Sequence, residues 1–143
     1  MTIRNISSTT FLALLFWSCS NKFHSVSKVE YFQYGGYNDT ICALIDGNIY
    51  ERDSSNSPNN RLRPLQNVKI KIEQNNKSVL TDTAGHFLIG AEKGSFSLLV
   101  TKDGYQELRL TNYISDPDQV SKAKIILAKG TRPQTYKIAD RKK

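Results

Sequence analysis

Hydrophobic and polar residues alternate along most of the chain after residue 41. In the segment "NVKIKIEQ", Val68, Ile70 and Ile72 share one face of an extended chain, and the two lysines between them face the other way. A period of two is typical of a strand with one buried face. The same pattern predicts strands at residues 43–51, 67–74, 77–81, 86–90, 95–100, 105–110 and 123–128.

These short strands predict an all-β fold, an antiparallel β-sandwich of about seven strands with one core between two sheets. The chain after the first 18 residues shows no persuasive amphipathic helix. Adjacent asparagines in "EQNNK" predict a hairpin between Ile72 and Val79, because asparagine tolerates positive φ. The other residues that we assign to turns are Gly47, Asp82, Gly85, Gly94 and Gly104. Gly47 belongs here because Asp46-Gly47 can form a two-residue hairpin that divides the first strand.

The segment "TDTAGHF", residues 81–87, can be a turn, a metal loop or an acidic site. In a turn, Asp82 accepts hydrogen bonds from backbone N–H groups, Gly85 takes positive φ, and Phe87 enters the core. A calcium loop needs several oxygen ligands at alternate positions, and this segment offers only Asp82 and Thr83. The segment therefore predicts a turn and no metal site.

The first 18 residues have the organisation of a signal peptide. Arg4 precedes an unbroken run of seven apolar residues, Phe11 to Trp17, far fewer than the roughly 20 that span a bilayer. The end of this segment, "FWSC", resembles a bacterial lipobox, which implies lipidation of Cys19. Phe16 departs from the aliphatic residue usual at that place, so a plain secreted protein or an uncleaved anchor is the alternative.

Residues 19–40 form the expected lipidated N-terminus and tether. The second half of the tether, "VEYFQYGGY", contains aromatic residues that favour a strand before a Gly-Gly break, so an edge strand is one interpretation. The alternative is a platform on which a sugar or another ligand stacks, formed by Tyr31, Phe32, Tyr34 and Tyr37. We expect the β-sandwich at residues 41–129 and a basic tail at 130–143, disordered or partly paired.

Charge and candidate catalytic residues do not indicate an enzyme. A net charge of +7 can indicate a nucleic-acid partner, but export of the chain argues against one. Lysines such as Lys122 and Lys124 occupy outward strand positions, where a charged face is usual. His24, His86 and Cys42 lack zinc-site spacing, and Asp116 and Asp118 lie in an expected loop, "SDPDQ". We therefore predict no catalytic residues, no metal and no cofactor.

Several segments, taken in order, resemble the carboxypeptidase regulatory-like domain, a transthyretin-like (prealbumin-like) β-sandwich. They are "IDGNIYE", "RPLQNVKIKIEQ", "TDTAGHFLI" and "GSFSLLVTKDGYQEL", and the resemblance covers roughly residues 43–128. The main departure is Asn67, which stands where the family usually has glycine; asparagine is the next best residue at positive φ. The resemblance implies a sandwich that serves as an accessory module, and it does not imply carboxypeptidase activity.

Two functions from different classes follow from these features. The first is a non-catalytic lipoprotein, anchored by lipid in the cell envelope of a Gram-negative bacterium (the outer membrane), whose sandwich binds an envelope protein. The second is a carbohydrate- or ligand-binding lipoprotein that works with an outer-membrane uptake system, for which the four aromatic residues would have to be exposed. Thr40 and Thr83 also match a short bacterial O-glycosylation motif, Asp-Thr followed by an apolar residue.

Overall fold

The computed structural model describes residues 26–35, 42–52, 61–115 and 119–138, which form ten β-strands and no helix. This part of the chain has no helix long and apolar enough to cross a membrane. The prediction of an all-β fold is therefore confirmed, with more strands than expected. The strands are β1 Lys28–Gly35, β2 Cys42–Arg52, β3 Leu62–Pro64, β4 Lys69–Ile72, β5 Ser78–Leu80, β6 His86–Glu92, β7 Gly94–Thr101, β8 Leu108–Ser115, β9 Gln119–Leu127 and β10 Gln134–Lys137.

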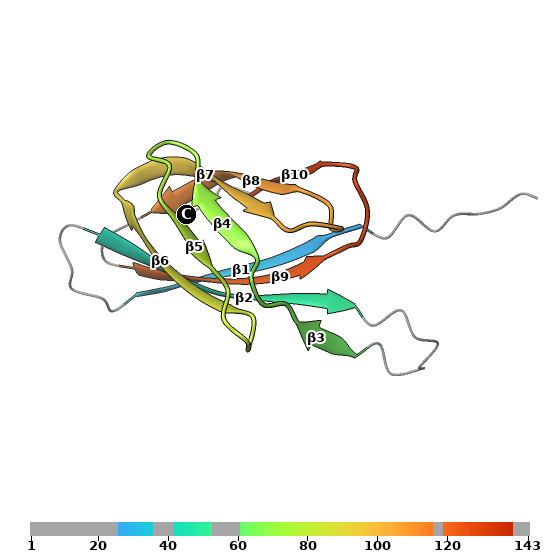
Figure 1. The fold of residues 1–143 in the computed structure, drawn as a ribbon. Helices are drawn as coiled ribbons and strands as arrows, with labels where there is room; N and C mark the ends of the chain where they lie inside the picture. The colour runs from blue at the N-terminus through green and yellow to red at the C-terminus, as the bar shows by residue number, and fades with distance from the viewer. Residues whose placement is uncertain (1–25, 36–41, 53–60, 116–118, 139–143) are drawn as a thin grey trace, which may run out of the picture.

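The strands form two sheets that face each other as a β-sandwich (Figure 1). Sheet A has the order β1-β9-β2-β3, and β6 also pairs with β2. Sheet B has the order β10-β8-β7-β4-β5. Most pairs are antiparallel, but β2 pairs with β9 in parallel, and so does β8 with β10. The sandwich was predicted as antiparallel without these two parallel pairs, because the alternation of side chains is the same in both strand directions.

The core lies between the two sheets and consists of the inward half of each alternating strand. Ile45 and Phe87 come from sheet A, Ile70 and Leu98 come from sheet B, and all four are buried. The lysines expected to face outward do so, and Lys69, for example, is exposed beside buried Ile70. Burial of this apolar surface is the main favourable term in folding.

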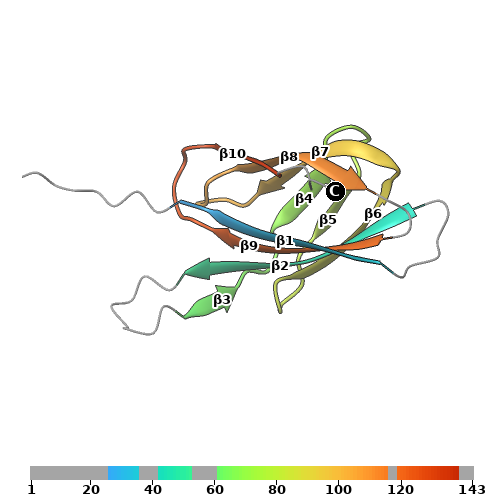
Figure 2. The ribbon, with the colours of Figure 1, turned by 180° about the vertical axis from the view of Figure 1, so that it is seen from behind.

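Three strands were not part of the predicted set, and two of them extend the sheets beyond residues 41–129. The segment 28–35, which the sequence left as either tether or strand, is edge strand β1, paired along its length with β9 (Figure 2). The short strand β10 lies in the expected tail and pairs with β8. β3 is a three-residue strand paired with the end of β2.

Gly47 does not lie in a turn, and its assignment to a turn was wrong. It lies inside β2, opposite Phe87 of β6 and beside Ala123 of β9. A β-carbon at residue 47 would collide with the ring of Phe87, which fills the space beside the glycine backbone. Glycine is required here because a neighbouring group approaches the strand closely.

Asparagine residues occupy backbone conformations that disfavour most side chains. Asn67, the departure from the family pattern, has φ of 55°, and Asn76 in the β4–β5 hairpin has φ of 60°, as expected for both segments. Asn112 in β8 also has φ of 60° and was not expected. It lies where the β7–β8 register shifts, and its side chain donates a hydrogen bond to the Ile138 carbonyl at 3.2 Å.

Candidate functional site: the outer face of sheet A

Tyr31 and Phe32, two members of the aromatic platform that the sequence left as an alternative, face opposite sides of sheet A, because neighbouring residues of a strand alternate between its two faces. Tyr31 faces the core, where its ring meets that of Tyr113 edge-on, with 4.8 Å between ring centroids. Phe32 faces outward and is 53% exposed. Tyr34 lies in β1 opposite Val120, and Tyr37 lies outside the described residues. The platform hypothesis is therefore wrong for Tyr31.

A different set of apolar residues crosses the outer face of sheet A. Val120 of β9 lies opposite Leu44 of β2 in the register of the sheet. Phe32 of β1 is opposite Lys122, one diagonal step from Val120, and Leu88 of β6 is opposite Asp46, one diagonal step from Leu44. Cross-strand and diagonal neighbours on one face are roughly 4.5–8 Å apart, within reach of long side chains. We call Phe32, Val120, Leu44 and Leu88 the outer apolar band.

The outer apolar band is accessible to solvent. Phe32 is 53% exposed, Leu88 is 48% exposed, and Leu44 and Val120 are partly exposed. Their sequence neighbours Ile45 and Ile89 are buried in the core, so the strands cannot turn over to hide the band. Outward positions of an antiparallel sheet are usually polar, and a contiguous exposed apolar patch is typical of a site that binds another molecule.

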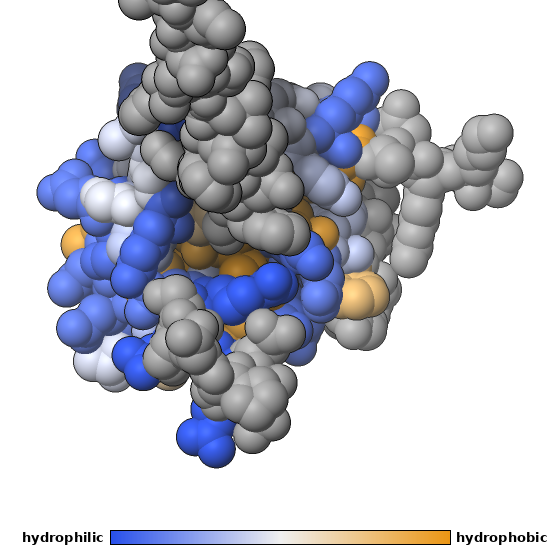
Figure 3. Space-filling view, turned by 90° about the vertical axis from the view of Figure 1, so that its right-hand side faces the viewer, coloured by the Kyte–Doolittle hydropathy of each residue, from blue (hydrophilic) through white to orange (hydrophobic). Residues whose placement is uncertain are grey.

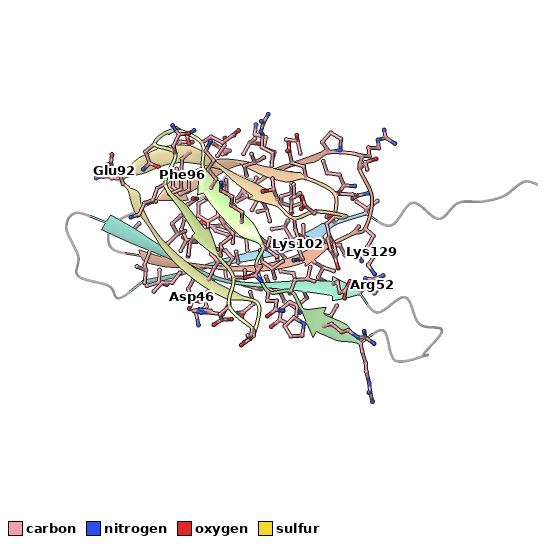
Figure 4. All side chains as sticks on the ribbon, in the orientation of Figure 1. Asp46, Arg52, Glu92, Phe96, Lys102 and Lys129 are labelled. Carbon is pink, nitrogen blue, oxygen red and sulfur yellow. The ribbon has the colours of Figure 1, made fainter. Side chains whose placement is uncertain are left out.

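Charged side chains lie beside the outer apolar band, around Asp46 of β2, which is labelled in Figure 4. The Nε2 atom of His86 is 2.8 Å from Oδ1 of Asp46, and Nζ of Lys122 is 3.9 Å from Oδ2 of Asp46. The other ring nitrogen of His86 faces Asp82 at 4.0 Å. Both ring nitrogens of His86 therefore face carboxylates, and these contacts fix the orientation of the ring beside the outer apolar band.

A hollow lies at one end of the sandwich, between loops that join strands of both sheets. It has a volume of about 510 Å³, and its lining includes Lys69, Lys102, Asp103, Tyr105 and Glu107. Figure 3 views the molecule from the end where Lys102 and Lys129 lie in Figure 4, and hydrophilic residues surround small hydrophobic areas there. The lining carries both positive and negative side chains, so its charge does not select one class of ion.

Tyr105 is held at this end by a hydrogen bond. Its hydroxyl donates to Oε2 of Glu51 at 2.6 Å, and Nζ of Lys129 lies 3.6 Å from the same oxygen. Burial, followed by the hydrogen bond to Glu51 and its negative charge, raises the pKa of Tyr105 to about 12. The group ties the β7–β8 connection of sheet B to the end of β2 in sheet A.

The segment "TDTAGHF" folds as a turn between β5 and β6. Oδ1 of Asp82 accepts hydrogen bonds from the N–H groups of Ala84 and His86, both at 2.9 Å, and Gly85 has φ of 73°. Thr83 is exposed in the same turn. These contacts give Asp82 a structural role in the turn, as the sequence predicted.

Thr81 has a role that sequence reasoning missed. Its buried hydroxyl donates to the Leu65 carbonyl at 2.6 Å and accepts from the Val68 N–H at 2.9 Å. It therefore satisfies two backbone groups of the connection between β3 and β4. A threonine at the end of an apolar strand, just before the turn, is the only signal for this role in the sequence.

The remaining predicted positions are placed as follows. Gly94 begins β7 with φ of 136°, and Gly104 lies in the β7–β8 turn with φ of 83°. Cys42 begins β2. Cys19, His24, Thr40, Asp116 and Asp118 lie outside the described residues. Within the part of the chain that the structure describes, no three His, Cys, Asp or Glu residues are grouped so that they could hold a metal ion.

Comparison of the chain with protein-family models and with curated proteins found no match. Support for a function therefore comes from the residues and the geometry of the chain itself.

Proposed function

We propose that this chain is a non-catalytic lipoprotein, anchored by lipid to a membrane of the cell envelope, and that its β-sandwich binds an envelope protein. The observation that carries the proposal is the outer apolar band, which crosses four strands of sheet A and is exposed at both ends, Phe32 and Leu88. An exposed patch of this kind is unfavourable for an unbound soluble surface, so its retention is explained if a partner covers it.

A protein partner fits the outer apolar band better than a glycan does. Three of its four members are the aliphatic residues Leu44, Leu88 and Val120, whereas a sugar-stacking surface needs flat aromatic rings. Tyr31, which the glycan hypothesis requires on the surface, packs against Tyr113 instead. The charged group of Asp46, His86 and Lys122 supplies the polar rim typical of protein interfaces.

The resemblance to the carboxypeptidase regulatory-like domain belongs to the same proposal. It is supported by the all-β fold and by positive φ at Asn67, where the family usually has glycine. An accessory sandwich of this kind acts by binding, and the lipid at Cys19 would keep it at the membrane.

The anchor can be tested apart from the binding surface. We expect Cys19→Ala to move the protein from the membrane fraction to the soluble fraction of the envelope, because the acyl chains provide the membrane affinity. A Cys42→Ala variant is the matched control and should stay with the membrane. Continued membrane retention of Cys19→Ala would contradict lipid anchoring.

The binding surface can be tested by photo-crosslinking in living cells. A photoreactive amino acid is placed at Leu88 in the outer apolar band or at Leu80, which is similarly exposed at 56% but lies on β5 of sheet B. The proposal predicts a discrete crosslinked protein band from position 88 and a much weaker one from position 80. Equal crosslinking from the two positions, or none from position 88, would contradict it.

A further inference from the structure

Strand β1 forms one edge of sheet A among the strands that the structure describes. Among the described strands, β1 pairs only with β9, and its eight residues make it the longest of the edge strands. Val26 and Phe32 are 60% and 53% exposed on this segment. An edge strand with unpaired backbone groups can add a strand from another chain.

The outward side chains of this segment, Val26, Lys28, Glu30 and Phe32, form a self-complementary series. If two copies pair antiparallel around Val29, Lys28 of each lies opposite Glu30 of the other, and Val26 of each lies opposite Phe32 of the other. We propose that β1 pairs in this register with β1 of a second copy of the chain, joining two sheets A into one continuous sheet.

Neighbouring registers lack this complementarity. Pairing around Glu30 places two glutamates opposite each other, pairing around Lys28 places two lysines opposite each other, and pairing around Tyr31 places Glu30 opposite Phe32. Like charges directly opposite are unfavourable, whereas opposite charges and apolar pairs are favourable. The register around Val29 gives two ionic pairs and two apolar pairs at once.

The side chains of β9 extend the ionic pairs. Oε2 of Glu30 is 3.6 Å from Nζ of Lys124 on the neighbouring strand. In the joined sheet, Glu30 would therefore lie between Lys124 of its own chain and Lys28 of the second copy. Alternating charges across three strands reinforce the register.

The start of the segment is already fixed in the single chain. The Ser27 N–H donates to the Gln134 side chain at 3.0 Å, and the Ser27 hydroxyl accepts from the Ala128 N–H at 3.1 Å. These contacts hold residue 27 inward while Val26 faces solvent. A strand edge that is ordered before binding loses less conformational entropy when a second strand joins it.

This inference does not rest on the proposed function, because pairing uses the backbone edge of sheet A and the envelope partner would use its outer face; Phe32 takes part in both. The joined sheet would place two outer apolar bands on one surface. A variant that loses the envelope partner but still pairs through β1, or one that loses pairing but still binds the partner, would distinguish the two proposals.

The register can be tested by charge exchange in full-length chains that carry two different affinity tags and are co-expressed. After solubilisation in mild detergent, one tag is captured and the amount of the other tag that comes with it is measured. This co-capture reports pairing of the two chains. We expect that Lys28→Glu in both chains, or Glu30→Lys in both chains, lowers co-capture about tenfold, because each reverses two cross-strand charge pairs. A chain with Lys28→Glu co-expressed with a chain with Glu30→Lys should restore co-capture, because every opposed pair is then ionic again.

Lys137→Glu in both chains is the matched control, because it makes the same change of charge at an exposed position on β10 of sheet B. It should leave co-capture unchanged. Co-capture that results only from two chains sharing a detergent micelle would be the same for this variant and for the β1 variants. Thermal melting of each variant establishes that the exposed substitutions leave the fold intact. Absence of co-capture for the unaltered chains, or failure of the mixed pair of folded variants to exceed the single variants, would overturn the proposal.

Discussion

The two sheets of the sandwich are alike on the inside and different on the outside. Both contribute alternate apolar residues to one core. Among the side chains that the structure describes on the outer face of sheet B, Leu80 and Leu99 are apolar, and strand β4 with its lysines separates them. On the outer face of sheet A the apolar residues adjoin one another across four strands. The apolar residues that face inward determine the fold, whereas the apolar residues that face outward can form a binding surface.

The interior of sheet A should be the most sensitive to substitution at Gly47. We expect Gly47→Ala to lower the free energy of unfolding by about 3 kcal/mol, because the added methyl collides with the Phe87 ring and overpacks the core. Denaturant unfolding measures the effect. Gly90→Ala in β6 is the control, since its methyl would approach only the flexible end of Lys77, at 3.4 Å, and it should cost far less.

The junction between the sheets depends on Thr81. We expect Thr81→Val to lower the free energy of unfolding by about 2 kcal/mol, because the Leu65 carbonyl and the Val68 N–H each lose a buried hydrogen bond. Exposed Thr83 provides the control substitution, Thr83→Val, which should have little effect in the same unfolding measurement. Similar losses for both variants would contradict the structural role of the Thr81 hydroxyl.

Sheet B should gain stability from a substitution at Tyr113. Its ring stacks on Phe96 with centroids 5.1 Å apart, and its buried hydroxyl makes no hydrogen bond of standard geometry within the described part of the chain, although the Tyr31 and Ser121 hydroxyls lie close enough to influence its pKa. The nearby Tyr31 and Ser121 hydroxyls bond each other at 3.3 Å. Burial is the largest cause that raises the pKa of Tyr113 above its usual range. Tyr113→Phe should therefore stabilise the protein by about 1 kcal/mol in thermal or denaturant unfolding, and a loss of stability would contradict this account.

Tyr105, which ties the two sheets together at one end, should make the stability of the protein depend on pH. An unfolded chain loses the phenol proton near pH 10, whereas the folded chain keeps the Tyr105 proton until about pH 12, because burial and Glu51 raise its pKa. The folded state therefore binds more protons in this interval, and the free energy of unfolding falls as pH rises from 10 to 12. Tyr105→Phe should make this slope shallower in denaturant unfolding, and the slope that remains should come from Tyr113, whose pKa is also raised.

The sequence predicted the all-β class, the central strands and the hairpin at Asn76, because alternation and turn residues act locally. It did not predict the parallel pairs, because alternation is the same for both strand directions. Gly47 was assigned to a turn because an Asp-Gly dipeptide can form either a hairpin turn or a strand position with a close cross-strand contact. Only the position of Phe87 in the folded chain distinguishes these two structures.

The candidate site was less predictable than the fold. The sequence identified the aromatic segment, but whether Tyr31 or Phe32 faces outward depends on how β1 pairs with β9. The outer apolar band joins residues from four strands, separated by up to 88 positions between Phe32 and Val120, and it exists only after the strands are placed in register. Thr81 was missed because its two backbone partners come from a different connection.

The most direct test of the outer apolar band compares Leu88→Asp with Leu80→Asp in binding to the protein crosslinked at position 88. Both positions are exposed, so both variants should fold with stability close to that of the unaltered chain. The account predicts that Leu88→Asp weakens binding at least about tenfold, because a charge is buried in the apolar interface, and that Leu80→Asp binds normally. Equal binding by the two variants would contradict the claim that the outer face of sheet A is the binding surface.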